Sequence, residues 1–174
     1  MKYQRLSSSF FQRDVLRVAP ELIGKYIVRQ ANGVQTAYRI TETEAYRGEE
    51  DLACHASKGR TPRTDVMYRN GGVVYVYLIY GMYQMLNFVT AKENEPQAAH
   101  IRGIETAAGP GRLTRLLQID SSFYAEDLST SARLWVEDRG EPAPKITTGK
   151  RVGVDYAGVW KNKPWRFFEL KIKN

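Results

Sequence analysis

Carboxylates and an aromatic ring cluster at the end of one predicted strand, in the stretch Glu42-Thr43-Glu44-Ala45-Tyr46, and Asp51 and His55 follow closely. A carboxylate held among aromatic side chains at a strand end can act as a general base toward water. The same residues also fit a solvated acidic strand end without chemistry. A third interpretation is a divalent-metal site built from Glu42, Glu44, Asp51 and His55, although no tight D-x-D or H-x-H spacing is present. The spacing alone leaves these interpretations open.

Tyrosine is the second residue type that could do chemistry, with 11 copies among 174 residues. Tyr75 and Tyr77 stand two positions apart in one apolar stretch. Packing within a strand is the commonest role for such residues, but the two rings could also hold a flat ligand. Nucleic-acid bases are the usual flat ligand of a basic protein, because stacking contributes about 1–3 kcal/mol per base.

The element that must position these rings is the stretch from Gly71 to Thr90, whose β-branched and aromatic arms around Gly81 predict a hairpin. A three-residue loop, Tyr80-Gly81-Met82, is a common hairpin length. With that loop, Tyr77 faces Met85 and Tyr75 faces Asn87. Because side chains alternate along a strand, these four share one face.

The tip of this predicted hairpin carries Tyr80 and Met82, where a soluble protein should prefer Asn, Asp or Ser. An exposed aromatic side chain at this place suits insertion into a partner. We expect Tyr80 to act as a wedge between base steps, entering from the minor groove.

Hydrophobic periodicity and turn residues predict the other elements. A helix is expected over Phe10–Ile23, with Phe10, Phe11, Val15, Leu16 and Leu22 buried. Strands are expected over Lys25–Arg29 and Val34–Tyr46, joined by a turn at Asn32-Gly33, and alternation would place Ile40, Glu42, Glu44 and Tyr46 on one face. Further along, we expect a short helical piece at Leu52–His55 and a helix from Thr61-Pro62 toward Met67. A strand is expected over Ala98–Ile104. A helix is expected over Arg112–Gln118, with Leu113, Leu116 and Leu117 inward. Later strands are expected over Leu134–Val136, Arg151–Val154 and Arg166–Ile172, with a loop over Glu141–Thr148.

Strands joined by hairpins rather than by βαβ units predict an α+β fold. The length suits one domain over residues 1–174. No apolar run approaches the ~20 residues of a membrane span. The N-terminus lacks the apolar core of a secretory signal. One cysteine, Cys54, permits no internal disulfide, so we expect a reducing cytoplasmic setting, nucleoid-associated if the protein is bacterial.

The chain carries a net charge of +7, and most of the excess lies in residues 142–174, where eight lysines and arginines stand against two acids. A polyanionic partner fits this charge. Charge alone does not identify such a partner, because many basic proteins bind no nucleic acid.

Several stretches in order resemble the alkyladenine (methylpurine) DNA glycosylases. They are ETEAY (42–46), DLACH (51–55), TPR (61–63), YVYLIYGMYQMLN (75–87), IRGIE (101–105), Gly109-Pro110 and RVGVDYAGVWKNKPWRFF (151–168). The resemblance runs from about Phe10 to Phe168. It implies one mixed domain with a curved antiparallel sheet, peripheral helices and a protruding β-hairpin.

The resemblance also implies a function and a role for each matching residue. Such a protein, a monomer without metal or cofactor, would flip alkylated or deaminated purines out of double-stranded DNA and hydrolyse the N-glycosidic bond without AP-lyase activity. Glu44 would activate the attacking water and Arg102 would help to hold it. Tyr46 and His55 would stack on one face of the base and Tyr77 on the other, while Asn87 would obstruct the exocyclic amino group of guanine. Tyr80 and Met82 would enter the duplex, and Thr61 and Arg63 would contact its backbone.

Two other function classes stay open at this stage. A metal-dependent phosphodiesterase would use Glu42, Glu44 and Asp51 as ligands. A non-catalytic DNA-binding module would use the tyrosines and the positive charge alone.

Overall fold

The strand β3 (Val34–Arg47) is the longest element of the computed structural model, which describes residues 3–171. Its first half pairs with β2 (Tyr26–Ala31) across the Asn32-Gly33 turn, where both residues have positive φ. Its second half pairs with β6 (Gln97–Ile104) on one side and with β10 (Arg166–Glu169) on the other. The predicted turn and both predicted strands around it are therefore confirmed.

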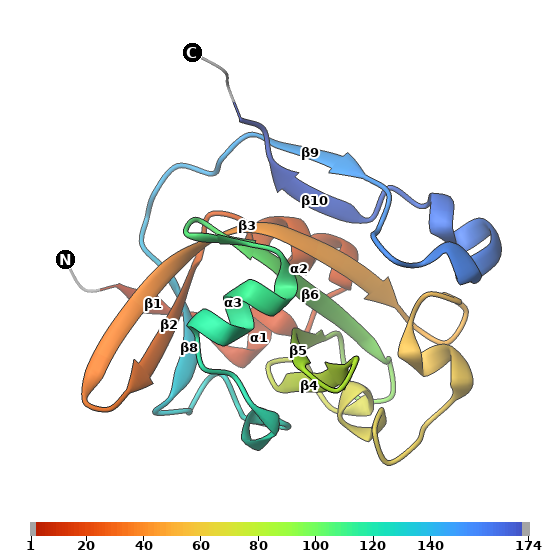
Figure 1. Ribbon diagram of the computed structural model, residues 1–174, viewed down its shortest axis with the longest axis horizontal. Helices are drawn as coiled ribbons and strands as arrows, with labels where there is room; N and C mark the ends of the chain where they lie inside the picture. The colour runs from red at the N-terminus through yellow and green to blue at the C-terminus, as the bar shows by residue number, and fades with distance from the viewer. Residues whose placement is uncertain (1–2, 172–174) are drawn as a thin grey trace.

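The other strands extend this sheet, and every pairing is antiparallel. Beyond β6 come β5 (Tyr83–Thr90) and β4 (Val74–Ile79), and beyond β2 come β8 (Leu134–Asp138) and β1 (Gln4–Arg5). The short strands β7 (Ala107–Ala108) and β9 (Ile146–Gly149) pair with β6 and β10. Residues 3–171 thus form a single α+β domain around one antiparallel sheet, as predicted (Figure 1).

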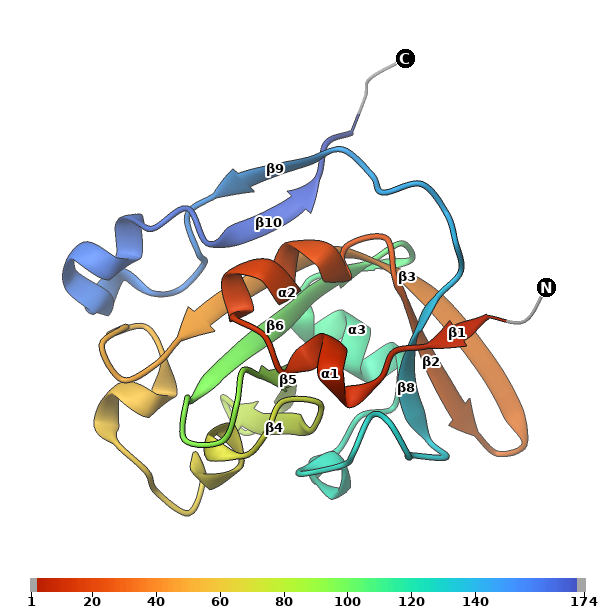
Figure 2. The same cartoon turned by 180° about the vertical axis from the view of Figure 1, so that it is seen from behind.

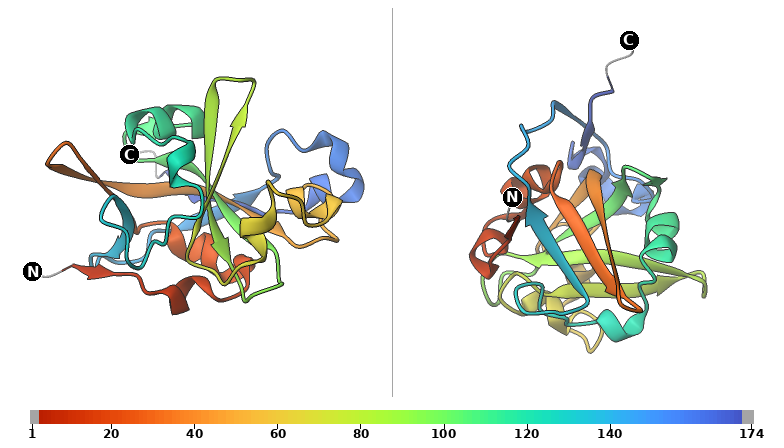
Figure 3. Two further views of the ribbon diagram at one scale, coloured as in Figure 1. Left: turned by 90° about the horizontal axis from the view of Figure 1, so that it is seen from below. Right: turned by 90° about the vertical axis from the view of Figure 1, so that its left-hand side faces the viewer.

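The hairpin of β4 and β5 projects from the body of the molecule (Figure 3, left). Its register pairs Ile79 with Tyr83, Tyr77 with Met85 and Tyr75 with Asn87, which is the predicted register. The loop residues Tyr80 and Gly81 both have positive φ, at 51° and 65°.

Three short α-helices pack on the sheet: α1 (Ser8–Phe11), α2 (Val15–Leu22) and α3 (Pro110–Leu116). Helices α1 and α2 lie in front of the sheet in Figure 2, whereas α3 lies in front in Figure 1. The Asp14 side chain caps α2 by accepting from the Leu16 N–H at 2.9 Å. Within residues 3–171, no helix has the length and apolar character that a membrane crossing requires.

A second buried cluster lies beside the main core, under the 3-10 helices η1 (His55–Lys58) and η2 (Asp65–Tyr68). It contains Cys54, Met67, Tyr75 and Ala98, among others. Cys54 is buried as expected of a small hydrophobe, and burial raises its pKa to about 12. Two further 3-10 helices are η3 (Ser121–Phe123) and η4 (Asp155–Asn162).

Three helix predictions were wrong in their bounds. The expected helix over Phe10–Ile23 is two helices, because the carbonyls of Phe11 and Arg13 both accept from the Ala91 N–H at 2.9 Å and leave the helical path. The helical piece expected at Leu52–His55 begins at His55. The helix expected from Thr61-Pro62 begins at Asp65, because the Thr61 hydroxyl and the Thr64 N–H close a local turn at 3.2 Å.

The later strands were partly wrong. Residues 151–154 form no strand, since Arg151 turns inward to a buried carboxylate and Gly153 takes a positive φ of 73°. The strand β9 begins instead inside the expected loop over Glu141–Thr148 and ends one residue beyond it, at Gly149. The strand expected over Arg166–Ile172 is β10 and ends at Glu169, while Ile172 lies outside the described residues.

Two predicted side-chain directions were also wrong. Leu116 on α3 is 44% exposed, whereas Leu113 and Leu117 are buried as predicted. Ile40 belongs to the main core together with Ala45, not to the face of Glu44. A β-bulge between Ile40 and Thr43 shifts the alternation by one residue and separates the two faces.

Candidate active site

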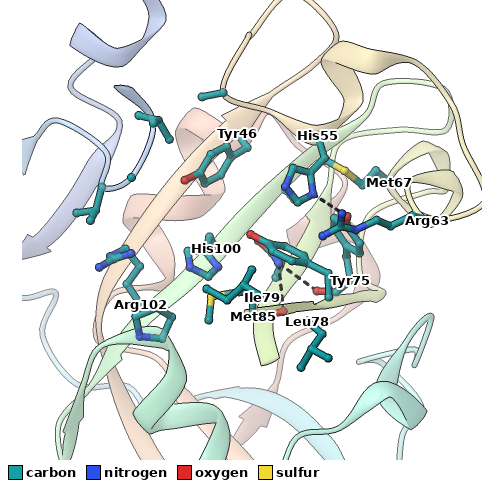
Figure 4. A pocket seen from close by; sticks show the side chains of 18 of the residues that line it. Tyr46, His55, Arg63, Met67, Tyr75, Leu78, Ile79, Met85, His100 and Arg102 are labelled. Atoms are coloured by element: carbon teal, nitrogen blue, oxygen red, sulfur yellow. Dashed lines mark hydrogen bonds between the residues drawn. The ribbon is translucent and has the colours of Figure 1, made fainter. Parts of the chain in front are cut away.

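Four side chains stand in one row across four strands of the sheet. Glu44 on β3 pairs with His100 on β6, His100 pairs with Asn87 on β5, and Asn87 pairs with Tyr75 on β4. Directly opposed residues have Cβ atoms about 4.5–5.5 Å apart and share a face. His100, Asn87 and Tyr75 line a cavity of about 670 Å³ together with Tyr46, His55, Tyr77 and Arg102 (Figure 4). The structure thus gathers the predicted base-pocket residues around one cavity, and Glu44 lies directly behind the lining residues Tyr46, Arg102 and Val152.

Glu44 is fully buried and is held by two hydrogen-bond donors and one cation. The Tyr46 hydroxyl donates to one carboxylate oxygen at 2.6 Å, while the other lies 3.1 Å from Arg102 Nε and accepts from the Val152 N–H at 3.2 Å. Burial raises the pKa of Glu44, and the Arg102 cation and the two hydrogen bonds only partly oppose this. Glu44 is therefore a carboxylate whose environment makes it a stronger base than an exposed glutamate.

Arg102 links the two glutamates of the ETEAY stretch. Its Nε–H donates to Glu42 at 3.2 Å and lies within ion-pair distance of Glu44. Arg166 on β10 also donates to Glu42, at 3.3 Å. Glu42 thus anchors the guanidinium that faces Glu44.

A buried ion pair that the sequence interpretation missed supports this wall of the cavity. Arg151 and Asp51 are both inaccessible to solvent and form two hydrogen bonds, at 2.6 and 2.9 Å. Arg151 also donates to the Ala45 carbonyl, and its guanidinium lies 4.9 Å from the centre of the Tyr46 ring. Arg151 therefore holds the end of β3, the Tyr46 ring and the loop that presents Val152 to Glu44. The run of apolar residues around Arg151 suggested a strand and hid this role.

Aromatic rings form the opposite wall. His55 Nδ1 lies 2.8 Å from the Tyr75 hydroxyl, and the His55 and Tyr77 ring centres are 4.5 Å apart. Burial and the nearby Arg63 and Lys58 cations lower the pKa of His55 to about 4, so its ring is neutral at neutral pH. A base stacked between two rings needs about 3.5 Å on each face. A base can therefore enter between His55 and Tyr77 only if one of these rings moves.

The residues predicted to meet DNA lie at or near the cavity mouth. Tyr80 is 88% exposed and Met82 is 62% exposed at the hairpin tip. Arg63 lies 4.9 Å over the Tyr77 ring, at the edge of the cavity. Thr61 is half-buried and its hydroxyl contacts Thr64 within the local turn.

The four residues of the alternative metal site do not form a ligand group. Asp51 accepts from Arg151 and from the N–H groups of Arg47 and Ala53. Among residues 3–171, no three histidine, cysteine, aspartate or glutamate side chains are arranged to hold a metal ion. Asp51 is therefore a member of the buried ion pair with Arg151.

Comparisons with known proteins show the family to which this chain belongs. A family model described as "Methylpurine-DNA glycosylase (MPG)" matches residues 9–172. The chain is 44% identical over 184 residues to a protein of Methanocella arvoryzae, covering 94% of this chain and 92% of the relative. It is 42% identical over 193 residues to one of Desulfitobacterium hafniense, covering 95% of each. Both relatives carry the name "Putative 3-methyladenine DNA glycosylase". The protein belongs to the methylpurine-DNA glycosylase family, which confirms the resemblance of its motifs.

Proposed function

We propose that the protein is a monofunctional DNA glycosylase that hydrolyses the N-glycosidic bond of damaged purines, alkylated or deaminated, and so initiates base excision repair. The observation that carries this proposal is the buried Glu44 carboxylate, which is held by three residues that line an aromatic cavity, Tyr46, Arg102 and Val152, beside an exposed tyrosine-tipped hairpin. Family membership supports the same reaction class. Action as a monomer and location in the cytoplasm remain predictions.

The reaction needs a base and a stabiliser of positive charge. Cleavage of an N-glycosidic bond develops oxocarbenium character at the sugar. In the proposed mechanism, Glu44 stabilises this cation and takes a proton from the water that attacks C1′. Arg102, within 3.1 Å of Glu44, helps to orient that water. An alkylated purine already carries positive charge and leaves readily, so no strong general acid is required.

The residues around the cavity also support hydrolysis without strand cleavage. An AP-lyase step through a Schiff base needs an amine nucleophile. Among the described residues that line the cavity, the cationic side chains are the arginines Arg63 and Arg102, and none is a lysine. This composition suits a monofunctional enzyme.

The base must leave the duplex to reach Glu44. Enzymes that act on a base extrude it, and a damaged base costs least to unstack. In the proposed complex, Tyr80 and Met82 fill the gap in the duplex while Thr61 and Arg63 contact the backbone. Tyr46 and His55 stack on one face of the extruded base and Tyr77 on the other, which requires the His55 and Tyr77 rings to move apart. Asn87 obstructs the exocyclic amino group of an undamaged guanine.

Substitution of Glu44 tests the proposal. Glu44→Gln should retain binding to a lesion-containing duplex but lower single-turnover base release by at least about 10²-fold, because the general base is lost. Release is measured from duplexes that each carry one lesion, with alkaline cleavage of the abasic sites. Glu21→Gln, an exposed acid on α2, is the matched control and should behave as the wild type. Normal base release by Glu44→Gln would refute the assignment.

A further inference from the structure

The proposed mechanism gives no role to Glu42, the other glutamate of the ETEAY stretch. The Oε1 atom of Glu42 accepts from Arg102 Nε at 3.2 Å and from a terminal nitrogen of Arg166 at 3.3 Å. Arg102 Nε also lies 3.1 Å from the Glu44 carboxylate. These contacts form a row of alternating charge that ends at the proposed general base, in the order Arg166, Glu42, Arg102 and Glu44.

The register between β3 and β6 places Arg102 between the two glutamates. Glu42 pairs with Gly103 and Thr43 pairs with Ile101, so no residue of β3 pairs with Arg102. Irregularities of this kind re-aim a side chain. Gly103 permits the close approach of the strands, because a Cβ atom there would lie 3.2 Å from Glu42 Cβ. The backbone thus holds Arg102 within reach of both carboxylates.

Glu42 also decides which edge of the Arg102 guanidinium is left free. The Nε edge is held by the glutamates. The two terminal nitrogens form no hydrogen bond with residues 3–171, and neither is among the atoms sealed from solvent without a partner. Arg102 lines the cavity, and Figure 4 shows it at the side away from the His55 ring. Because a guanidinium is a rigid planar fork of donors, a fixed Nε edge leaves the terminal N–H groups available to the attacking water.

The charge of Glu42 bears on the ionisation of Glu44. Burial raises the pKa of Glu44, and the Arg102 cation lowers it. Glu42 draws on the same cation and adds a like charge nearby, so both of its effects make Glu44 a stronger base. Besides Glu42 and Arg166, the titratable and charged groups around Glu44 are Arg102 and His100 on β6, Tyr46 on β3, Tyr77 on β4, and Arg151 and Tyr156 after β9.

We propose that Glu42 is a positioning residue, which orients Arg102 toward the attacking water and keeps Glu44 a stronger base than Arg102 alone would allow. Glu42 acts through Arg102 and not on the base itself. Arg166 opposes it, since Arg166 shares the Glu42 oxygen that binds Arg102. This inference rests on the proposed glycosylase function and adds two residues to its charge network.

The first test is the pH dependence of single-turnover base release from methylated DNA by Glu42→Gln. The glutamine oxygen can still accept from Arg102 Nε, but the charge is lost, so Glu44 ionises more readily and becomes a weaker base. The acid limb should move to lower pH by about one unit. The plateau rate should fall about threefold, because general-base efficiency follows basicity.

Glu42→Ala separates the orienting effect from the charge effect. This variant lacks the acceptor as well as the charge, so the Arg102 guanidinium loses its anchor. The plateau rate should fall by at least about tenfold, since a misplaced group costs catalysis. The protein concentration that gives half-maximal release should change by less than about twofold, because the loss lies in the chemical step.

Arg166→Gln is a second variant, and its expected shift has the opposite sign. Without Arg166, Glu42 attracts Arg102 more strongly and one cation beside Glu44 is lost. Both changes disfavour the ionised form of Glu44, so the acid limb should move to higher pH. This variant keeps the inference testable if Glu42→Gln does not fold, which thermal melting of each variant checks.

Glu126→Gln is the matched control. Its side chain is 20% exposed, against 21% for Glu42, and it pairs with Arg133 outside the cavity. It should keep the wild-type pH profile.

Two results would overturn the inference. An acid limb at the wild-type pH in both Glu42→Gln and Arg166→Gln, with or without a uniform loss of rate, would show that Glu42 only supports the fold. Equal plateau rates in Glu42→Ala and Glu42→Gln would show that Glu42 does not orient Arg102. Absence of any base release by the wild-type protein would instead refute the proposed function, and this inference with it.

Discussion

At the scale of single residues, the strongest prediction concerns the hydroxyl of Tyr46, which donates to Glu44. A donor to the carboxylate stabilises the ionised form, so Tyr46→Phe should raise the pKa of Glu44 further. The general base must be ionised, so activity increases as pH rises through that pKa. The acid limb of the pH–rate profile should therefore move to higher pH, with release several-fold slower at low pH and rates that converge at higher pH.

Single-turnover release across the acidic range measures this shift. Tyr26→Phe is the matched control, because the Tyr26 hydroxyl bonds Glu141, outside the cavity. An acid limb at the wild-type position in Tyr46→Phe would show that the hydroxyl does not tune Glu44.

A second prediction at this scale concerns the pair of Asp51 and Arg151. Removal of one partner leaves the other charge buried and unpaired, which costs about 3–5 kcal/mol. Arg151→Met should lower the free energy of unfolding in urea by this amount, and Asp51→Leu/Arg151→Met should recover part of the loss. Arg13→Ala, in an exposed ion pair with Glu21, should cost at most about 1 kcal/mol. Equal losses in Arg151→Met and Arg13→Ala would contradict this account.

Some of the cavity residues could be predicted from the sequence and others could not. The hairpin register alone placed Tyr75, Tyr77 and Asn87 on one face. His100 carried a usable signal, since alternation along the predicted strand Ala98–Ile104 puts it on the face of Arg102. Arg151 carried no such signal, because no local sequence pattern reveals that its guanidinium will pair with Asp51, 100 residues earlier in the chain.

At the scale of elements, the hairpin tip combines exposure with backbone strain. Tyr80 has a φ of 51°, a conformation that non-glycine residues adopt at a cost. Tyr80→Gly should therefore keep or slightly increase the melting temperature while it lowers affinity for a lesion-containing duplex by about tenfold, since the lost stacking is worth about 1–3 kcal/mol.

The melting temperature and the DNA affinity together distinguish a Tyr80 that inserts into the duplex from a Tyr80 that only supports the fold. Tyr80→Phe, which keeps the ring, is the control and should bind as the wild type. Wild-type affinity in Tyr80→Gly would remove the wedge from the mechanism.

The elements that were predicted least well from the sequence depend on contacts between residues far apart in the chain. The bulge in β3 separates Ile40 from Glu44, and it is visible only once β6 is in place. Strand β9 lies in a proline-containing stretch and exists because β10 offers it an edge. The hairpins at Asn32-Gly33 and at Tyr80–Met82, by contrast, join strands that are adjacent in the sequence around a glycine, and both were predicted correctly.

At the scale of the whole molecule, basic side chains flank both sides of the projecting hairpin. The segment of η1 and the turn that follows it lies on one side of the hairpin and α3 lies on the other (Figure 3, left). The first segment carries exposed Lys58 and Arg63, and α3 carries exposed Arg112 and Arg115 next to Gly111, which packs against Tyr83. Four cations on phosphates give a slope of log affinity against log salt of about −3.5, which is roughly a 100-fold loss between about 50 and about 200 mM salt.

Replacement of two of these cations tests whether the duplex lies across this surface. Arg112→Gln/Arg115→Gln should make the slope shallower by about two for damaged and undamaged duplexes alike. Lys92→Gln is the control, because Lys92 follows the end of β5 that is remote from the tip. A slope unaffected by the double substitution would place the duplex elsewhere on the surface.

The row of Glu44, His100, Asn87 and Tyr75 has one further consequence, for how such a protein can diverge. His100, Asn87 and Tyr75 line the cavity, with Glu44 behind its wall, because four strands keep their register. A single deletion inside β6 would turn His100 and Arg102 to the opposite face and bring Ile101 into their place. Evolution can therefore alter the accepted lesion by exchanging one side chain at a time. Changes in chain length that preserve the cavity are therefore expected in the connections outside the row.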